Sequence, residues 1–137
     1  MNRLALAQRV AAALDADDLP ATAALLDPAV VYGIGDRVLR GPDAVCASYA
    51  ESAAWGAANL DQVTYDSAVS LAPDGTAVLA FVDHLRVGEH RHTYRCEQVL
   101  GFTDSPPLRV ATLTHRELPG EREALLAWFA TVGVTPR

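Results

Sequence analysis

The sequence contains no lysine, and all eleven of its basic side chains are arginine. Arginine stays protonated in proteins and cannot act as an amine nucleophile, so Schiff-base chemistry and a lysine-anchored pyridoxal cofactor are excluded. The arginines are scattered along the chain and are outnumbered by seventeen acidic residues, which gives a formal net charge of −6. Because nucleic acids and anionic membranes are bound by clustered positive charge, we expect neither of them as a partner.

Cysteine is also scarce, since Cys46 and Cys96 are the only two and neither lies in a CxxC motif. This pattern favours reduced, packed thiols over a redox or zinc site. The N-terminal segment is interrupted by Gln8 and Arg9, so it lacks the continuous apolar stretch of a signal peptide or a membrane span. We therefore expect a cytoplasmic protein.

Several motifs of enzymes are missing as well. Gly33-Ile34-Gly35 lacks the third glycine and the following helix of a phosphate-binding loop, and no G-x-S-x-G nucleophile elbow is present. The run His90-Arg91-His92, followed by Glu97, gives H-x-H-x4-E and resembles the first metal motif of cupins. No second cupin motif follows, and the glycine spacing around the first one differs. The sequence therefore predicts neither a metal nor another cofactor.

What the sequence does contain is typical of one globular domain spanning residues 1–137. Hydrophobic residues make up 50% and charged residues 20%, without a repeat, a linker or a low-complexity tract. Helical periodicity and helix-start signals predict three helices in the first half, over residues 2–15, 19–26 and 42–55. Pro28 is expected to end the second helix. Short strands are predicted over Val30–Tyr32 and Val38–Arg40.

After Gly56, β-branched residues and regularly spaced turn signals dominate the sequence. Asp74-Gly75 and Gly88-Glu89 are typical of hairpin turns, and Ser105-Pro106-Pro107 breaks the chain before a last strand. Four strands are predicted, over Gln62–Leu71, Thr76–Val87, His90–Thr103 and Leu108–Leu118, followed by a final helix after Gly120. The pattern indicates an α+β fold in which a curved antiparallel meander wraps around helices.

Asp83 is the polar exception on a strand face that also carries Phe81 and Leu85. If the hairpin closes about Gly88-Glu89, Asp83 pairs with Tyr94 across the two strands. Burial among apolar side chains would raise the pKa of this carboxyl group toward the range that is useful for acid–base chemistry. The alternative is that Asp83 lies at a solvated end of the sheet and forms a structural hydrogen bond.

His115 is the candidate general base on the last strand, because imidazole titrates near neutral pH. The apolar parity of this strand changes from Leu108 and Val110 to Leu113, which predicts a β-bulge near Ala111-Thr112. Such a bulge would turn His115 inward, together with Glu117. A histidine that is hydrogen-bonded for structural reasons is the alternative.

Four segments taken in order carry a family resemblance, namely Asp18–Tyr32, Leu39–Gly41, Asp83–Cys96 and His115–Glu121. Together they resemble the nuclear transport factor 2-like superfamily, and the SnoaL-like branch in particular, over nearly the whole chain. The resemblance implies a cone-shaped pocket and homodimers formed through the sheet. It also implies functions that range from isomerases, polyketide cyclases and epoxide hydrolases to proteins without a reaction, so that the fold alone does not settle the function.

The resemblance also locates catalytic positions. Ketosteroid isomerase has its catalytic aspartate on the strand before the third helix, where this sequence has Tyr32, so we do not expect that mechanism. The arginine–aspartate–aspartate pattern of limonene epoxide hydrolase is not reproduced, because the last strand carries His115 and Glu117. SnoaL-type cyclases place an acid–base aspartate late in the sheet, which implies a comparable role for His115.

We therefore predict a small-molecule pocket whose catalytic residues are His115, Asp83 and Tyr94, with His115 as the base and Asp83 orienting it or sharing its proton. The predicted substrate-binding residues are Tyr32, Tyr49, Trp55, Phe81, Cys96, Gln98 and Glu117. The expected reaction is a cofactor-free proton transfer on a small, largely apolar substrate, of the cyclase, isomerase or dehydratase type. The alternative is a non-catalytic domain that binds a ligand or supports dimerisation, with a pocket filled by Trp55, Phe81 and Trp128.

A homodimer is the expected assembly. Val78, Ala80 and Val82 alternate along one strand with an equally apolar set of inward residues, which leaves an apolar outer face on the sheet. We expect a second copy of the chain to bury this face.

Overall fold

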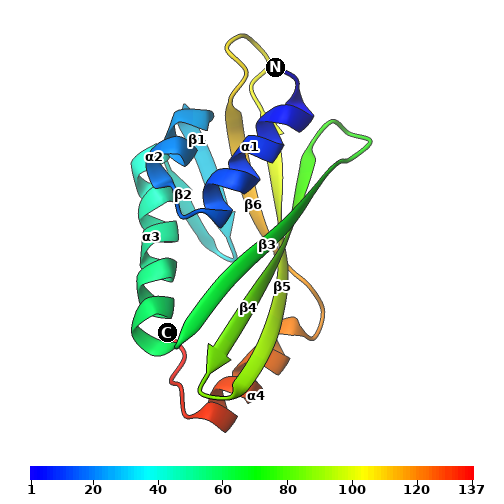
Figure 1. The fold of residues 1–137 in the computed structure, drawn as a ribbon. Helices are drawn as coiled ribbons and strands as arrows, with labels where there is room; N and C mark the ends of the chain where they lie inside the picture. The colour runs from blue at the N-terminus through cyan, green and yellow to red at the C-terminus, as the bar shows by residue number, and fades with distance from the viewer.

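A curved six-stranded sheet wraps around helices in the computed structural model, which describes all 137 residues (Figure 1). The helices are α1 (Arg3–Asp15), α2 (Leu19–Leu25), α3 (Pro42–Asn59) and α4 (Glu121–Val132). The strands are β1 (Leu26–Ile34), β2 (Arg37–Arg40), β3 (Gln62–Leu71), β4 (Ala77–Val87), β5 (His90–Phe102) and β6 (Val110–Glu117). Helices α1 to α3 lie over the concave side of the sheet, whereas α4 lies at one end of it. None of the helices is both long enough and apolar enough to cross a membrane.

The first two helices begin at side-chain caps. The Asn2 side chain accepts a hydrogen bond from the Ala5 amide at 2.8 Å, and Asp18 accepts one from the Ala21 amide at 3.1 Å. Each bond satisfies an amide that has no partner within its own helix. The predicted start of each helix is therefore confirmed.

Two predicted boundaries are wrong. Strand β1 begins at Leu26, so Pro28 lies within the strand rather than after a helix. The pairing of β1 with β6 shifts register between Leu26 and Val31, and at such an irregularity proline needs no amide hydrogen. Helix α3 continues to Asn59 instead of ending near Trp55, because Gly56 keeps helical geometry rather than ending the helix.

The strand order in the sheet is β2-β1-β6-β5-β4-β3. Strands β3 to β6 form the predicted antiparallel meander, and the register of the β4–β5 hairpin places Asp83 opposite Tyr94 and Phe81 opposite Cys96, as predicted. The β1–β2 hairpin adds to the free edge of β6, and β1 runs parallel to β6. The sheet is thus mixed, with one parallel pair that the sequence pattern did not reveal.

The predicted bulge in β6 is present. Gly101 pairs with Thr112 and Phe102 pairs with Val110, so Ala111 is the extra residue on β6. A β-bulge shifts the alternation of side chains by one position. Leu113, buried at 1% exposure, and the residues at two-residue intervals after it consequently face the concave side of the sheet.

The hydrophobic core fills one part of the cone. Sixteen buried residues form the main cluster, which joins α1 to the sheet and includes Leu6, Val10, Leu79 and Leu100. A smaller cluster of Leu60, Leu85 and Phe129 lies where α4 meets the sheet. Between the two clusters the concave face is not filled by side chains, and this space forms the cavity described below.

We expect Gly101→Ala to destabilise the protein at the bulge. A methyl group on Gly101 would collide with the Thr112 hydroxyl, and overpacking of this kind typically costs about 1–3 kcal/mol. Urea denaturation should show a smaller loss when the same change is made in a Thr112→Ala background, because the colliding group is then absent. Equal losses in both backgrounds would show that this contact does not limit position 101.

Candidate functional site

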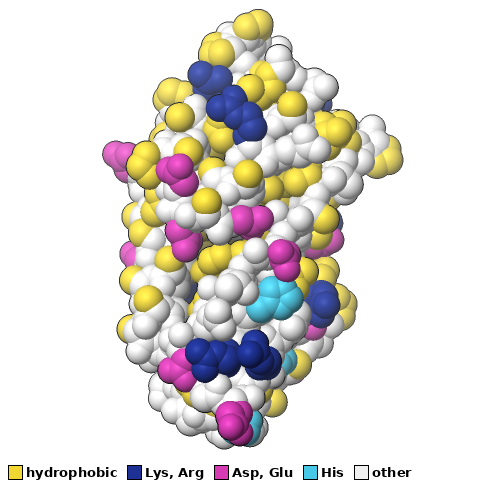
Figure 2. Space-filling model, in the orientation of Figure 1, with side chains coloured by type: hydrophobic (Ala, Val, Ile, Leu, Met, Phe, Trp, Pro, Cys, Tyr) yellow, Lys and Arg dark blue, Asp and Glu magenta, His cyan; other side chains and the backbone are white.

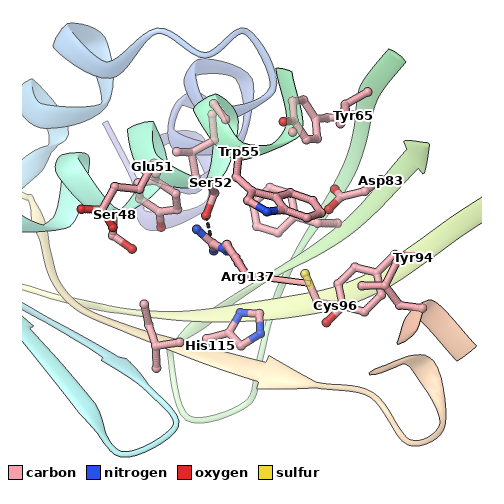
Figure 3. Close-up of a pocket in the computed structure, with 18 of the residues that line it drawn as sticks. Ser48, Glu51, Ser52, Trp55, Tyr65, Asp83, Tyr94, Cys96, His115 and Arg137 are labelled. Carbon is pink, nitrogen blue, oxygen red and sulfur yellow. Dashed lines mark hydrogen bonds between the residues drawn. The ribbon is translucent and has the colours of Figure 1, made fainter. Parts of the chain in front are cut away.

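A cavity of about 700 Å³ lies between α3 and the concave face of the sheet. Strands β1, β3, β4, β5 and β6 supply its floor, α3 supplies one wall, and α4 with the residues that follow it covers one side. The volume falls within the range of pockets that hold small organic molecules. Figure 3 shows polar side chains that project into this space from both the helix and the strands.

Asp83 is the most unusual group in the cavity. Its cross-strand neighbours are Tyr65 on β3 and Tyr94 on β5. Burial, followed by the nearby charge of Asp15, raises the pKa of its carboxyl group to about 6, although His84 lowers it somewhat. No hydrogen bond from the protein contributes to the pKa of this carboxyl group. Asp83 is therefore a largely desolvated carboxylate that faces the cavity.

Asp15, the last residue of α1, and Asp17, in the turn before α2, line the same end of the cavity. The Ser67 hydroxyl donates a hydrogen bond to Asp15 Oδ2, whereas Asp15 Oδ1 is buried and has no hydrogen-bond partner. Burial raises the pKa of the Tyr65 hydroxyl, and the charges of Asp17 and Asp83 raise it further. We call Asp15, Asp17 and Asp83 the acidic end of the cavity.

A network of neutral hydroxyl and amide groups lies at a second place in the cavity. Tyr49 donates a hydrogen bond to Gln98 Oε1 at 2.7 Å, and Gln98 Nε2 donates one to the Tyr32 hydroxyl at 3.1 Å. The two tyrosine rings stack at 5.6 Å between centroids. Burial raises the pKa of Tyr32 to about 12 and that of Tyr49 well above its ordinary value. Both phenols therefore stay protonated and act as hydrogen-bonding groups.

His115 lies next to this network, because it is the cross-strand partner of Gln98. Burial lowers the pKa of its imidazole, although Glu117 opposes the shift. The side chain is thus neutral near pH 7 and can accept a proton. Glu117 itself accepts a hydrogen bond from Arg122 at 3.4 Å.

Asp83 and His115 face the same cavity but do not act as a pair. Asp83 is level with Tyr94 on β5, whereas His115 is level with Gln98, and β5 separates their two strands. Two strand spacings and four residues place their backbones roughly 16 Å apart on a flat sheet. Neither group contributes to the pKa shift of the other. The structure therefore gives no support to the hypothesis that Asp83 orients His115 or shares its proton.

No family model matches this sequence, and no curated protein matches it. Solved structures do match most of its length. An NTF2-like protein with a cystatin-like fold from Novosphingobium aromaticivorans is 20% identical, with a TM-score of 0.64 over 90% of this chain and 84% of that one. Bal32a from a soil-derived mobile gene cassette is 17% identical, with a TM-score of 0.67 over 93% and 94% of the two chains. A protein from Xanthomonas campestris pv. campestris that is provisionally assigned as a polyketide cyclase is 15% identical, with a TM-score of 0.65 over 93% and 94%.

The chain has the nuclear transport factor 2-like fold. Its α+β architecture and the resemblance found in the sequence are thereby confirmed at the level of the fold. In this NTF2-like cone, each of the ten residues predicted for the site lines the cavity. They are Tyr32, Tyr49, Trp55, Phe81, Asp83, Tyr94, Cys96, Gln98, His115 and Glu117.

Two alternatives from the sequence differ from the observed geometry. Trp128 does not fill the NTF2-like cavity, because its ring stacks on His92 at 5.4 Å outside the lining residues. The cupin-like residues do not converge, since Glu97 follows the opposite parity of β5 from His92 and forms an ion pair with Arg116 at 2.7 Å. Cys96 does line the cavity, but burial raises the pKa of its thiol to about 12, so it stays protonated.

Sequence reasoning missed the site residues that come from distant segments. Asp15, Asp17 and Tyr65 belong to the acidic end and its surroundings. Arg137 donates a solvent-exposed hydrogen bond to Ser52 at 2.6 Å, and both residues line the cavity (Figure 3). Tyr65 could have been predicted from the sequence, because a hairpin that closes about Asp74-Gly75 pairs Tyr65 with Asp83. No local pattern signals the others.

We expect Asp83 to reduce the stability of the folded protein at neutral pH. A carboxyl group with a pKa of about 6 in the folded state and 3.8 as its ordinary value stabilises the fold only while it is protonated. That contribution is complete below about pH 4 and is lost as the pH rises through about 6. Asp83→Asn should therefore raise the free energy of unfolding by about 1–3 kcal/mol near pH 7.5 and change it little near pH 4.

Urea denaturation of both proteins at the two pH values checks this expectation. A loss of stability in Asp83→Asn at neutral pH would instead identify Asp83 as part of a structural polar network.

Proposed function

We propose that the cavity binds a small, largely apolar organic molecule and that Asp83 transfers a proton to or from it without a cofactor. The observation that carries this proposal is the desolvated Asp83 carboxylate, which faces the cavity with a pKa of about 6 that no hydrogen bond from the protein lowers. A general base is most effective when its pKa lies near the working pH. The reaction class is that of a cyclase, an isomerase or a dehydratase.

His115 and Tyr94 complete the proposed machinery. Tyr94 lies opposite Asp83, and burial raises the pKa of its hydroxyl to about 12. The hydroxyl therefore stays protonated and can donate a hydrogen bond to a substrate. His115, which is neutral, faces the other end of the cavity beside Gln98. An isomerisation or a cyclisation often needs one proton to be removed at one position of the substrate and another proton to be delivered at a second position.

The aromatic and apolar lining supports the expected substrate. Tyr32, Tyr49, Trp55 and Phe81 provide extended apolar surface, and Gln98 and Glu117 provide polar groups that fix an orientation. Several solved structures with this fold are assigned provisionally as polyketide cyclases, which supports a reaction of the cyclase type. A non-catalytic binding protein is the alternative outcome of the following test.

The proton-transfer step is tested with 5-nitrobenzisoxazole, a flat and neutral molecule that opens when a base removes its ring proton. We expect the protein to accelerate this reaction with an apparent pKa near 6, and Asp83→Asn to lower the rate by about a hundredfold or more. Asp66→Asn is the matched control, because Asp66 lies on the outer face of the sheet and hydrogen-bonds His84 there. Equal rates for the unmodified protein and Asp83→Asn would show that Asp83 is not the catalytic base and would favour a non-catalytic binding protein.

We also propose that two copies of the chain pair through the outer face of the sheet. Val78, Ala80 and Val82 of β4 are half-buried on this face, and Val99 lies opposite Val78 on β5. A second copy would cover this apolar strip.

We expect a dimer in sedimentation at tens of micromolar, roughly the range in which a specific interface persists. Ala80→Arg places a charge between Val78 and Val82 in the strip and should yield a folded monomer. A monomeric parent protein under the same conditions would contradict the proposal.

A further inference from the structure

We propose that the molecule bound in the cavity is an organic cation, an amine on an apolar or aromatic skeleton, and that its ammonium group sits at the acidic end formed by Asp15, Asp17 and Asp83. The inference rests on the proposed function, since it names the chemical class of the ligand for the same cavity. It stands on the placement of charges, on an unpartnered carboxylate oxygen and on the aromatic groups around them.

The charges that line the cavity are unevenly placed. Five carboxylates line it against three arginines, and the imidazole of His115 adds no charge near pH 7. The arginines are Arg37, Arg122 and Arg137. Arg122 donates to Glu117 and Arg137 donates to Ser52, whereas none of the three lowers the pKa of Asp83. The acidic end therefore holds negative charge that no cation of the cavity compensates.

The surface gives the same picture. Figure 2 shows acidic side chains gathered across the middle of one face, where the α1–α2 turn, α3 and β3 meet, with arginines above and below them. Such a distribution attracts cations to this face and repels anions from it.

The hydrogen bonding at the acidic end is incomplete within the protein. Asp15 Oδ1 is buried without any partner, and the Asp83 carboxylate receives no hydrogen bond from the protein. A buried carboxylate oxygen normally has a donor, because leaving it without one is costly. A primary ammonium group supplies three donors and a positive charge, which is the complement of two neighbouring carboxylates.

Aromatic rings surround this place. Tyr65 and Tyr94 flank Asp83 on the neighbouring strands, and Phe81 precedes it on the same face of β4. Figure 3 shows Trp55 extending from α3 toward the side of the cavity that holds Asp83. Aromatic faces attract organic cations while they also accept an apolar skeleton. An ammonium beside Asp83 would lower the pKa of this carboxyl group and keep it ionised near pH 7.

The experiment compares three molecules of similar size that differ in charge: 2-phenylethylamine, 2-phenylethanol and 3-phenylpropionate. Calorimetric titration near pH 7 should show the amine binding about tenfold or more tightly than the alcohol, with the carboxylic acid the weakest. Asp83→Asn and Asp15→Asn should each reduce the preference for the amine to about threefold or less, while the alcohol binds as before. Asp66→Asn on the outer face is the control and should keep the full preference.

Each outcome decides the matter. Equal affinity for the three molecules, or a preference for the carboxylic acid, would overturn the inference while leaving a ligand-binding cavity in place. Binding of none of them at millimolar concentration would count against the cavity as a binding site as well. If 5-nitrobenzisoxazole reacts through Asp83 but the protein binds the amine no more tightly than the alcohol, the proposed function stands and the inference of a cationic ligand is wrong. The amine should also inhibit that reaction competitively.

Discussion

The strict alternation of side chains along a β-strand is the constraint on which this site depends. Alternation decides that Phe81, Asp83 and Leu85 share the concave face, and the same rule would have sent His115 to the outer face without Ala111. One inserted residue reverses the parity of the last strand. The cavity therefore owes its polar groups on β6 to a local irregularity, and its apolar lining to the regular strands beside it.

The cavity also shows how a fold can tolerate a buried carboxylate that lowers its stability. The main hydrophobic cluster joins α1 to the sheet and extends as far as Phe81, which precedes Asp83 on the same face of β4. The capped helices and the long β4–β5 pairing add to the stability of this cluster. A single desolvated carboxylate removes only a part of the stability that such a domain has. The stability of the rest of the fold thus allows the cavity to hold a charge that is unfavourable for folding.

The sequence was sufficient for the features of the site that follow from hairpin register and from alternation along a strand. The hairpin count gave the pairing of Asp83 with Tyr94, and the parity change gave the bulge at Ala111. It was not sufficient where segments far apart in the chain meet. The parallel pairing of β1 with β6 and the approach of Asp15 to Asp83 follow from the closure of the whole cone, and no local periodicity encodes them.

The parallel contact between β1 and β6 bears on how the chain is made. Strand β1 ends at Ile34, whereas its neighbour β6 begins only at Val110. During synthesis on the ribosome, the β1–β2 hairpin must therefore wait for most of the chain before it gains a neighbour in the sheet. Until then one of its edges remains unpaired and open to other strands. The N-terminal part of the cone is consequently the part that a chaperone would have to protect longest.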